Sequence, residues 1–260
     1  MKIAKKHLLL TVTCLGLASV GSQQAGAANL ITNGDFTATN LGLTNRQIGF
    51  ANGAVDGWVS GSSATLLTPA LNYNFIFGPG VADTTGVLTK YNTQLFLCGS
   101  NNTVGGGVIP NSSPNGGNYL ALDGSFEVGP VSQQLSGLTI GNAYDLSFYW
   151  AAAQQTGYPA PSGLTEKLRV TLVGQTLSTP VVSYAERTYV NWAKVTMTFT
   201  ADSVNPILSF LSVGTPDGLP PFALLDGVSL ESVPEPSTCV ITTLLLGGLT
   251  LGRRRRANCA

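Results

Sequence analysis

The chain has 260 residues, of which 43% are hydrophobic, 10% are charged and 31 are glycines. Its 13 basic and 13 acidic residues balance only formally, because three basic residues lie before residue 28 and four lie after residue 252. The stretch from Asp35 to Glu235 holds six basic residues against 13 acidic ones, a net charge of −7. This excludes a basic surface for nucleic acid. The single histidine, His7, lies in the first segment, so no histidine-dependent triad or zinc site is expected beyond it.

Residues 1–27 have the three parts of a secretory signal peptide. Three lysines within the first six residues precede a mostly apolar stretch over 8–20, which is short for a bilayer span. Ala25 and Ala27 then place small residues where a signal peptidase reads them. We therefore expect cleavage after Ala27 and export of the protein, with an uncleaved anchor as the alternative.

Short segments of alternating apolar and polar residues recur through the middle of the chain, separated by Gly, Asn, Pro and Ser. The clearest cover 143–150, 166–173, 191–200 and 222–230. Alternation with a period of two residues and one polar face is typical of antiparallel strands in two packed sheets. Long amphipathic-helix patterns and internal repeats are absent. The sequence therefore predicts an all-β fold, a single antiparallel β-sandwich over residues 28–232.

The same alternation predicts which side chains point into the sandwich. In the first two segments these are Tyr144, Leu146, Phe148, Trp150, Leu168, Val170 and Leu172. In the third they are Ala193, Val195, Met197 and Phe199, with Lys194, Thr196 and Thr198 pointing outward. In the last segment one face holds Phe222, Leu224, Asp226, Val228 and Leu230. Cys98, the one cysteine between the two ends of the chain, is expected to pack as a small apolar residue.

A catalytic function would have to rest on carboxylates, because histidine is missing from this part of the chain. Asp123 and Glu127 lie in one Gly-rich loop, and Glu166 and Glu186 flank other predicted strands. Two carboxylates about 5–9 Å apart can hydrolyse a glycosidic bond. No local motif marks any such pair, so a carboxylate-based glycan hydrolase is the weaker alternative and a non-catalytic protein is expected.

The end of the chain, residues 233–260, combines three elements in a fixed order. They are Pro234, Glu235 and Pro236, then 14 uncharged residues over 238–251, then Arg253, Arg254, Arg255 and Arg256. The apolar stretch is shorter than the ~17–25 residues of a full helical span. An arginine cluster stops translocation on the cytoplasmic side of a membrane. We therefore predict a short transmembrane helix that anchors the exported protein.

This tail resembles the PEP-CTERM sorting signal, and the resemblance covers only residues 233–260. It implies an exported bacterial protein that is processed by exosortase, a membrane protease of the transpeptidase kind, as well as by signal peptidase. The implied location is first the membrane, through the C-terminal helix, and then the cell surface or the extracellular matrix.

Several short motifs between the two ends resemble galactose-binding-like jelly rolls, a group that includes carbohydrate-binding modules. They are NLITNGDF at 29–36, GW at 57–58, GNYLALDG at 117–124, VSQQL at 131–135 and ALLDGVSL at 223–230. The resemblance implies a jelly roll and, as in many relatives, a structural calcium where the first and last strands meet. Asp226 would then be a calcium ligand, although Thr37 stands where the group commonly has a glutamate. The alternative is that Asp226 accepts hydrogen bonds from a neighbouring loop or the first strand.

Lectin-like modules stack sugar rings on exposed aromatic side chains. The aromatic candidates are Trp58, Tyr73, Tyr149, Tyr158 and Trp192. Trp58 is expected in the core, and Tyr149, Tyr158 and Trp192 are the predicted glycan contacts. Since aromatic residues in a β-sandwich more often belong to the core or its rim, each of them can also have a purely structural role.

These features predict a non-catalytic protein that binds exopolysaccharide outside the cell. A structural or adhesion protein of the matrix, without glycan binding, is the alternative.

Overall fold

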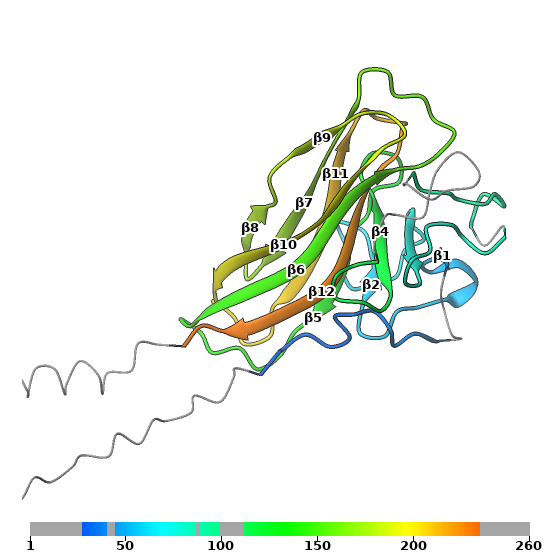
Figure 1. Ribbon diagram of the computed structural model, residues 1–260. Coiled ribbons are helices and arrows are strands. Elements are labelled where there is room, and N and C mark those ends of the chain that lie inside the picture. Colours follow the sequence, from blue (N-terminus) through cyan, green and yellow to red (C-terminus); the bar gives the residue numbers. More distant parts are fainter. Residues whose placement is uncertain (1–27, 41–44, 87–88, 99–111, 235–260) are drawn as a thin grey trace, which may run out of the picture.

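The computed structural model describes residues 28–40, 45–86, 89–98 and 112–234, and this part of the chain is all-β (Figure 1). Two antiparallel sheets pack face to face, which confirms the predicted β-sandwich. The first sheet, in spatial order, consists of β1 (Arg46–Gln47), β3 (Asn74–Phe77), β4 (Tyr119–Asp123), β12 (Pro221–Ser232), β6 (Ala143–Gln154) and β10 (Tyr189–Thr200). The second consists of β2 (Val59–Ser60), β5 (Val131–Gln134), β11 (Ile207–Thr215), β7 (Leu164–Leu172) and β8 (Gln175–Ser178), with β9 (Val182–Tyr184) also paired to β7. A 3-10 turn, η2 (Phe50–Asn52), follows β1.

Both ends of the described chain lie at the same end of the sandwich (Figure 1). The backbone N–H of Leu30 donates to the carbonyl of Leu230 at 2.9 Å, and Pro234 is exposed. The predicted signal peptide, Glu235, Pro236, the predicted C-terminal helix and the arginine cluster lie outside the described residues. Within those residues the structure contains no helix that is both long and apolar enough for a membrane crossing.

The main core lies between the two sheets and follows the predicted alternation on two strands. The predicted inward residues of β6 and β7 are all buried there, namely Tyr144, Leu146, Phe148, Trp150, Leu168, Val170 and Leu172. The ring of Trp58 packs 5.3 Å from that of Phe36 and 6.1 Å from that of Phe210. The predictions for these strands and for Trp58 are therefore confirmed. Cys98 is a buried free thiol, as predicted, and burial raises its pKa to about 11.

The prediction for β10 is only partly right. Met197 and Phe199 are buried in the main core and Val195 is half-buried, but Ala193 is exposed. β10 is the edge strand of its sheet, and its register against β6 shifts between Val190 and Ala193. An edge strand has a neighbour on one side only, so Ala193, next to this register shift, is left exposed.

The prediction that one face of β12 carries all five alternating residues is wrong. The register of β12 against β6 shifts between Asp226 and Ser229, and Gly227 has a positive φ of 61°. A bulge of this kind inserts one residue and moves the following side chains to the other face. As a result, Leu224 lies on the outer face of the first sheet and Leu230 in the main core.

The first sheet does not have the polar outer face that the alternation predicts. Its outer face carries a second core, composed of Tyr73, Phe75, Phe77, Ala82, Leu95, Leu97, Tyr119, Ala121, Ala151, Ala153, Phe222 and Leu224. Ala82, Leu95 and Leu97 come from the segment that follows β3. This segment folds over the sheet, so residues of β3 and β4 are buried on both faces.

The NGDF motif contacts the last strand. The N–H of Val228 donates to the carbonyl of Gly34 at 2.9 Å. A Cβ atom at residue 34 would lie 2.0 Å from the Val228 carbonyl oxygen, so the backbone approach requires glycine. The motif thus brings Asp35 toward Asp226, whose carboxyl pKa is raised chiefly by burial and further by the charge of Asp35.

Candidate functional site

An aromatic pocket of about 230 Å³ lies at one end of the first sheet. It is lined by Tyr73, Tyr91, Thr93, Phe126, Gln155, Tyr158, Gly218 and Pro220. These residues flank the start of β3, the end of β4, the end of β6 and the start of β12, which are neighbouring strand ends in the sheet. The pocket therefore lies at the opposite end of β12 from the contact between Leu30 and Leu230.

Four aromatic side chains form the apolar part of this pocket. Tyr73 is buried, whereas Tyr91, Phe126 and Tyr158 are 43%, 51% and 42% exposed. The ring of Tyr73 lies 5.9 Å from that of Tyr91 and 5.8 Å from that of Phe126, both edge to face. The rings of Tyr91 and Phe126 are 5.8 Å apart. The pocket therefore has a buried tyrosine at its base and exposed aromatic rings around its opening.

Gln155 is the main polar group of the pocket. Its side chain is 8% exposed, and its Nε2 donates to Tyr73 Oη at 3.4 Å. Its Oε1 is buried and has no hydrogen-bond partner in the described structure. Burial raises the pKa of Tyr73 to about 12, so the phenol keeps its proton at neutral pH. A buried acceptor without a partner is costly, and a ligand hydroxyl in the pocket would satisfy it.

Asp123 fixes the loop that carries Phe126. Its carboxylate accepts the backbone N–H groups of Ser125, Phe126 and Glu127 at 3.0, 3.2 and 2.6 Å. The side chain is completely buried, and burial raises its pKa. Because this carboxylate is used by the loop backbone, its role here is to hold the Phe126 ring in place.

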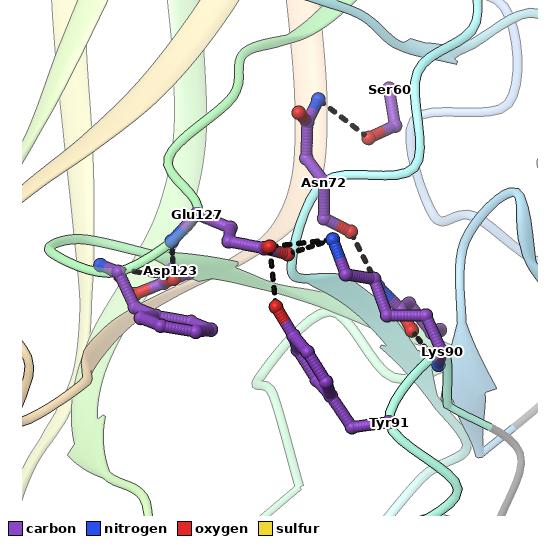
Figure 2. Close-up of polar contacts among 8 residues, drawn as sticks. Ser60, Asn72, Lys90, Tyr91, Asp123 and Glu127 are labelled. Atoms are coloured by element: carbon purple, nitrogen blue, oxygen red, sulfur yellow. Dashed lines mark hydrogen bonds and ion pairs between the residues drawn. The ribbon is translucent and has the colours of Figure 1, made fainter.

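Glu127 holds the exposed ring of Tyr91 in place. Figure 2 shows its carboxylate between Lys90 Nζ, 2.5 Å away, and Tyr91 Oη. The backbone N–H of Lys90 donates to Gln47 Oε1 at 2.7 Å, which ties this segment to β1. Tyr91 is thus positioned by an ion pair and a hydrogen bond (Figure 2).

The four carboxylates considered for a hydrolase do not form a pair that is available to a substrate. Asp123 binds loop backbone and Glu127 binds Lys90 and Tyr91. Glu166 is buried on β7, and Glu186 accepts the N–H of Ala160 at 2.7 Å.

Of the three predicted glycan contacts, Tyr149 and Trp192 do not line the aromatic pocket. Tyr158 lines the aromatic pocket with Tyr73. Tyr149 lies half-buried on the outer face of β6, where Lys194 Nζ is 5.8 Å from its ring centroid. Trp192 is half-buried against the second core, 5.6 Å from the ring of Tyr119.

Sequence reasoning missed Tyr91 and Phe126. Each is the one aromatic residue of a mostly polar segment, KYNTQ at 90–94 and DGSFEVG at 123–129. An isolated aromatic residue in such a loop was the available signal, because nothing there would bury it.

Asp226 has the features of a metal ligand in part. It is completely buried, its Oδ1 accepts the N–H of Gly227 at 2.6 Å, and its Oδ2 has no partner in the described structure. Burial raises its pKa to about 7. The next residue of β12, Gly227, borders a hollow that Asp226 itself does not line. The other lining residues are Asn29, Ile31, Asn33, Gly34, Asp35, Asn115, Val228 and Ser229.

These oxygen-rich side chains suit calcium, which binds carboxylate, amide and carbonyl oxygens. Where the jelly-roll resemblance implies a further carboxylate, this chain has Thr37, whose Oγ1 donates to Asp35 Oδ2 at 3.0 Å. No group of three or more His, Cys, Asp and Glu side chains gathers in the described residues. Two carboxylates, Asp35 and Asp226, thus lie near enough to interact here, and a calcium ion would need neutral oxygens in addition to them.

No model of a protein family matches the chain. Among curated proteins, Halomucin of Haloquadratum walsbyi is 27% identical over 248 residues, which cover 93% of this chain but 2% of Halomucin. The chain thus spans a small fraction of the relative that it matches.

Similar solved structures include carbohydrate-binding modules. TmCBM61 in complex with β-1,4-galactotriose has a TM-score of 0.37 and 13% identity, covering 80% of this chain and 100% of that one. The N-terminal cellulose-binding domain of Cellulomonas fimi β-1,4-glucanase C has a TM-score of 0.30 and 16% identity, covering 69% and 91%. At these TM-scores neither assigns a ligand to this chain.

Proposed function

We propose that the protein is a non-catalytic carbohydrate-binding protein and that the aromatic pocket holds a sugar ring. The observation that carries this proposal is the combination of exposed rings with the unpartnered Oε1 of Gln155. A pyranose has apolar C–H faces that pack on aromatic rings and hydroxyls that donate to such an acceptor. The Asp123 loop and the Glu127 ion pair hold Phe126 and Tyr91 before any ligand arrives, which lowers the entropy lost on binding.

A non-catalytic role is supported by the carboxylates nearest the pocket. Asp123 and Glu127 are engaged with loop backbone, Lys90 and Tyr91. A general acid or base has to reach the scissile bond, and moving either group would release the ring that it positions.

The test is a binding survey of the full chain against soluble neutral polysaccharides by affinity gel electrophoresis. Tyr158→Ala and Phe126→Ala are expected to weaken binding by about tenfold each, since a stacked aromatic contributes on the order of 1 kcal/mol. Ile140→Ala, an exposed apolar residue outside the pocket, is the matched control. If Tyr149→Ala and Trp192→Ala weaken binding instead, the sugar site is on the outer face of β6 and β10. If the chain binds no polysaccharide, a structural role is favoured.

We also propose a structural calcium held by Asp226 and Asp35. When bound, the ion would neutralise the buried carboxylate and link the NGDF segment to β12. The unpartnered Oδ2 of Asp226 and the amide side chains around it support this assignment.

For the cellular context we propose export, anchoring and exosortase processing, with matrix exopolysaccharide as the ligand. The signal-like residues 1–27 and the ordered elements of 233–260 support this proposal. Replacing Arg253 to Arg256 with alanine in the producing organism should prevent processing, which is visible as a mass change by immunoblot. Unchanged processing would contradict sorting through this tail.

A further inference from the structure

The outer face of the second sheet differs in charge from the rest of the described chain. Side chains of β7 alternate, so that Glu166 and Leu168 are buried inside while Lys167 and Arg169 point outward. Neighbouring outward residues are uncharged, because Leu211 and Val213 of β11 pair with Arg169 and Lys167. The outward side chains that the structure describes on β2, β5, β7, β8, β9 and β11 include no carboxylate.

Lys167 and Arg169 are also without partners among the described residues. Neither side chain makes a hydrogen bond or ion pair, whereas Lys90 binds Glu127. Two other cations lie over aromatic rings, Arg46 over Phe50 and Lys194 over Tyr149. The described part of the chain is acidic as a whole and repels an anionic polymer over most of its surface. The outer face of the second sheet is therefore where an anionic polymer can approach.

Arg169 borders a hollow of about 340 Å³ on this face. Its lining combines apolar side chains with hydroxyls, namely Ser63, Leu66, Pro130, Arg169, Thr171, Thr176, Ser209 and Leu211. The Oγ1 atoms of Thr171 and Thr176 lie 3.0 Å apart and form a hydrogen bond across the β7–β8 pair. An arginine beside hydroxyls and apolar patches suits a ring that carries both C–H faces and a carboxylate.

We propose that this face binds an acidic polysaccharide, with Arg169 and Lys167 pairing to uronate carboxylates along the chain of sugars. Lys167 and Arg169 are two residues apart on one strand face, so their Cα atoms are about 7 Å apart. The site is separate from the aromatic pocket and does not depend on the sugar proposed there.

The test uses polygalacturonate and its methyl ester, two polymers with the same backbone and different charge. The full chain is expected to bind polygalacturonate and not the ester, with binding that weakens as salt rises. The double variant Lys167→Gln/Arg169→Gln should bind about tenfold more weakly, through loss of two charge-assisted contacts. The single variant Arg169→Gln should also bind more weakly, whereas Arg187→Gln, which removes the same single charge from an exposed loop residue, should bind like the unmodified chain.

Three results would overturn the proposal: no binding of polygalacturonate, equal binding by the double variant, or equal binding of the methyl ester. Binding of duplex DNA with the same affinity would also overturn it, because the face would then attract any polyanion. Tyr158→Ala separates the two sites, since it should leave polygalacturonate binding unchanged even if the pocket binds no sugar. Unaltered thermal unfolding of each variant confirms that the exposed substitutions leave the fold intact.

Discussion

The outer faces of the two sheets have opposite environments. The first sheet is covered by the segment after β3, which adds a second core and buries both faces of β3. The second sheet keeps Lys167 and Arg169 outward on β7. The difference shows that alternation alone does not decide which face of a strand meets water. What decides is whether another apolar segment is available to cover it, as the segment with Leu95 and Leu97 does here.

The prediction with the largest expected effect compares the loss of one apolar side chain from the outer face of each sheet. Phe75→Ala in the second core should lower the free energy of unfolding by about 3–5 kcal/mol, because it leaves a large cavity. Leu211→Ala on the half-exposed face of β11 should cost under about 1 kcal/mol. Urea denaturation measures both. Equal losses would show that the second core contributes no more than a surface contact.

A second test concerns the inner face of β7, where Glu166 is buried. Its Oε1 accepts the N–H groups of Lys167 and Val213 at 2.8 and 3.1 Å, and its Oε2 has no partner in the described structure. Burial raises its pKa from 4.5 to about 8. The folded state therefore holds the proton more tightly, so stability is greatest below pH 4.5 and falls as the pH rises toward about 8.

The expected decline is on the order of a few kcal/mol. Glu166→Gln should remove most of this decline in the free energy of unfolding, whereas Glu186→Gln should leave it in place. Asp226, with a pKa near 7, contributes a smaller decline of the same sign. Urea denaturation at a series of pH values gives the profile, and an equal slope in Glu166→Gln would contradict a buried, protonated Glu166.

A third test concerns the link between the NGDF segment and β12. Calcium in large excess over its dissociation constant should stabilise the fold by about 2–3 kcal/mol, which thermal unfolding records as a higher Tm. Chelator should reverse the shift and Asp226→Asn should abolish it. The same Tm with calcium and with chelator would mean that Asp226 serves only as a hydrogen-bond acceptor.

The sequence revealed the alternation in β6 and β7 because polar residues mark their outward positions. It concealed the bulge at Gly227, since apolar residues continue with period two on both sides of it. It also concealed the second core, because the segment around Leu95 has no strand pattern. Of the pocket, only Tyr73 and Tyr158 were candidates. Tyr91 and Phe126 come from separate loops that only the tertiary fold brings within 5.8 Å.

The most direct measurement of the central claim is an isothermal titration of the full chain with a soluble oligosaccharide from a neutral polymer that it binds. We predict one sugar chain per protein, about tenfold weaker binding for Tyr158→Ala and for Phe126→Ala, and unchanged binding for Ile140→Ala. Equal affinities for all four proteins would contradict the assignment of the aromatic pocket as the sugar site.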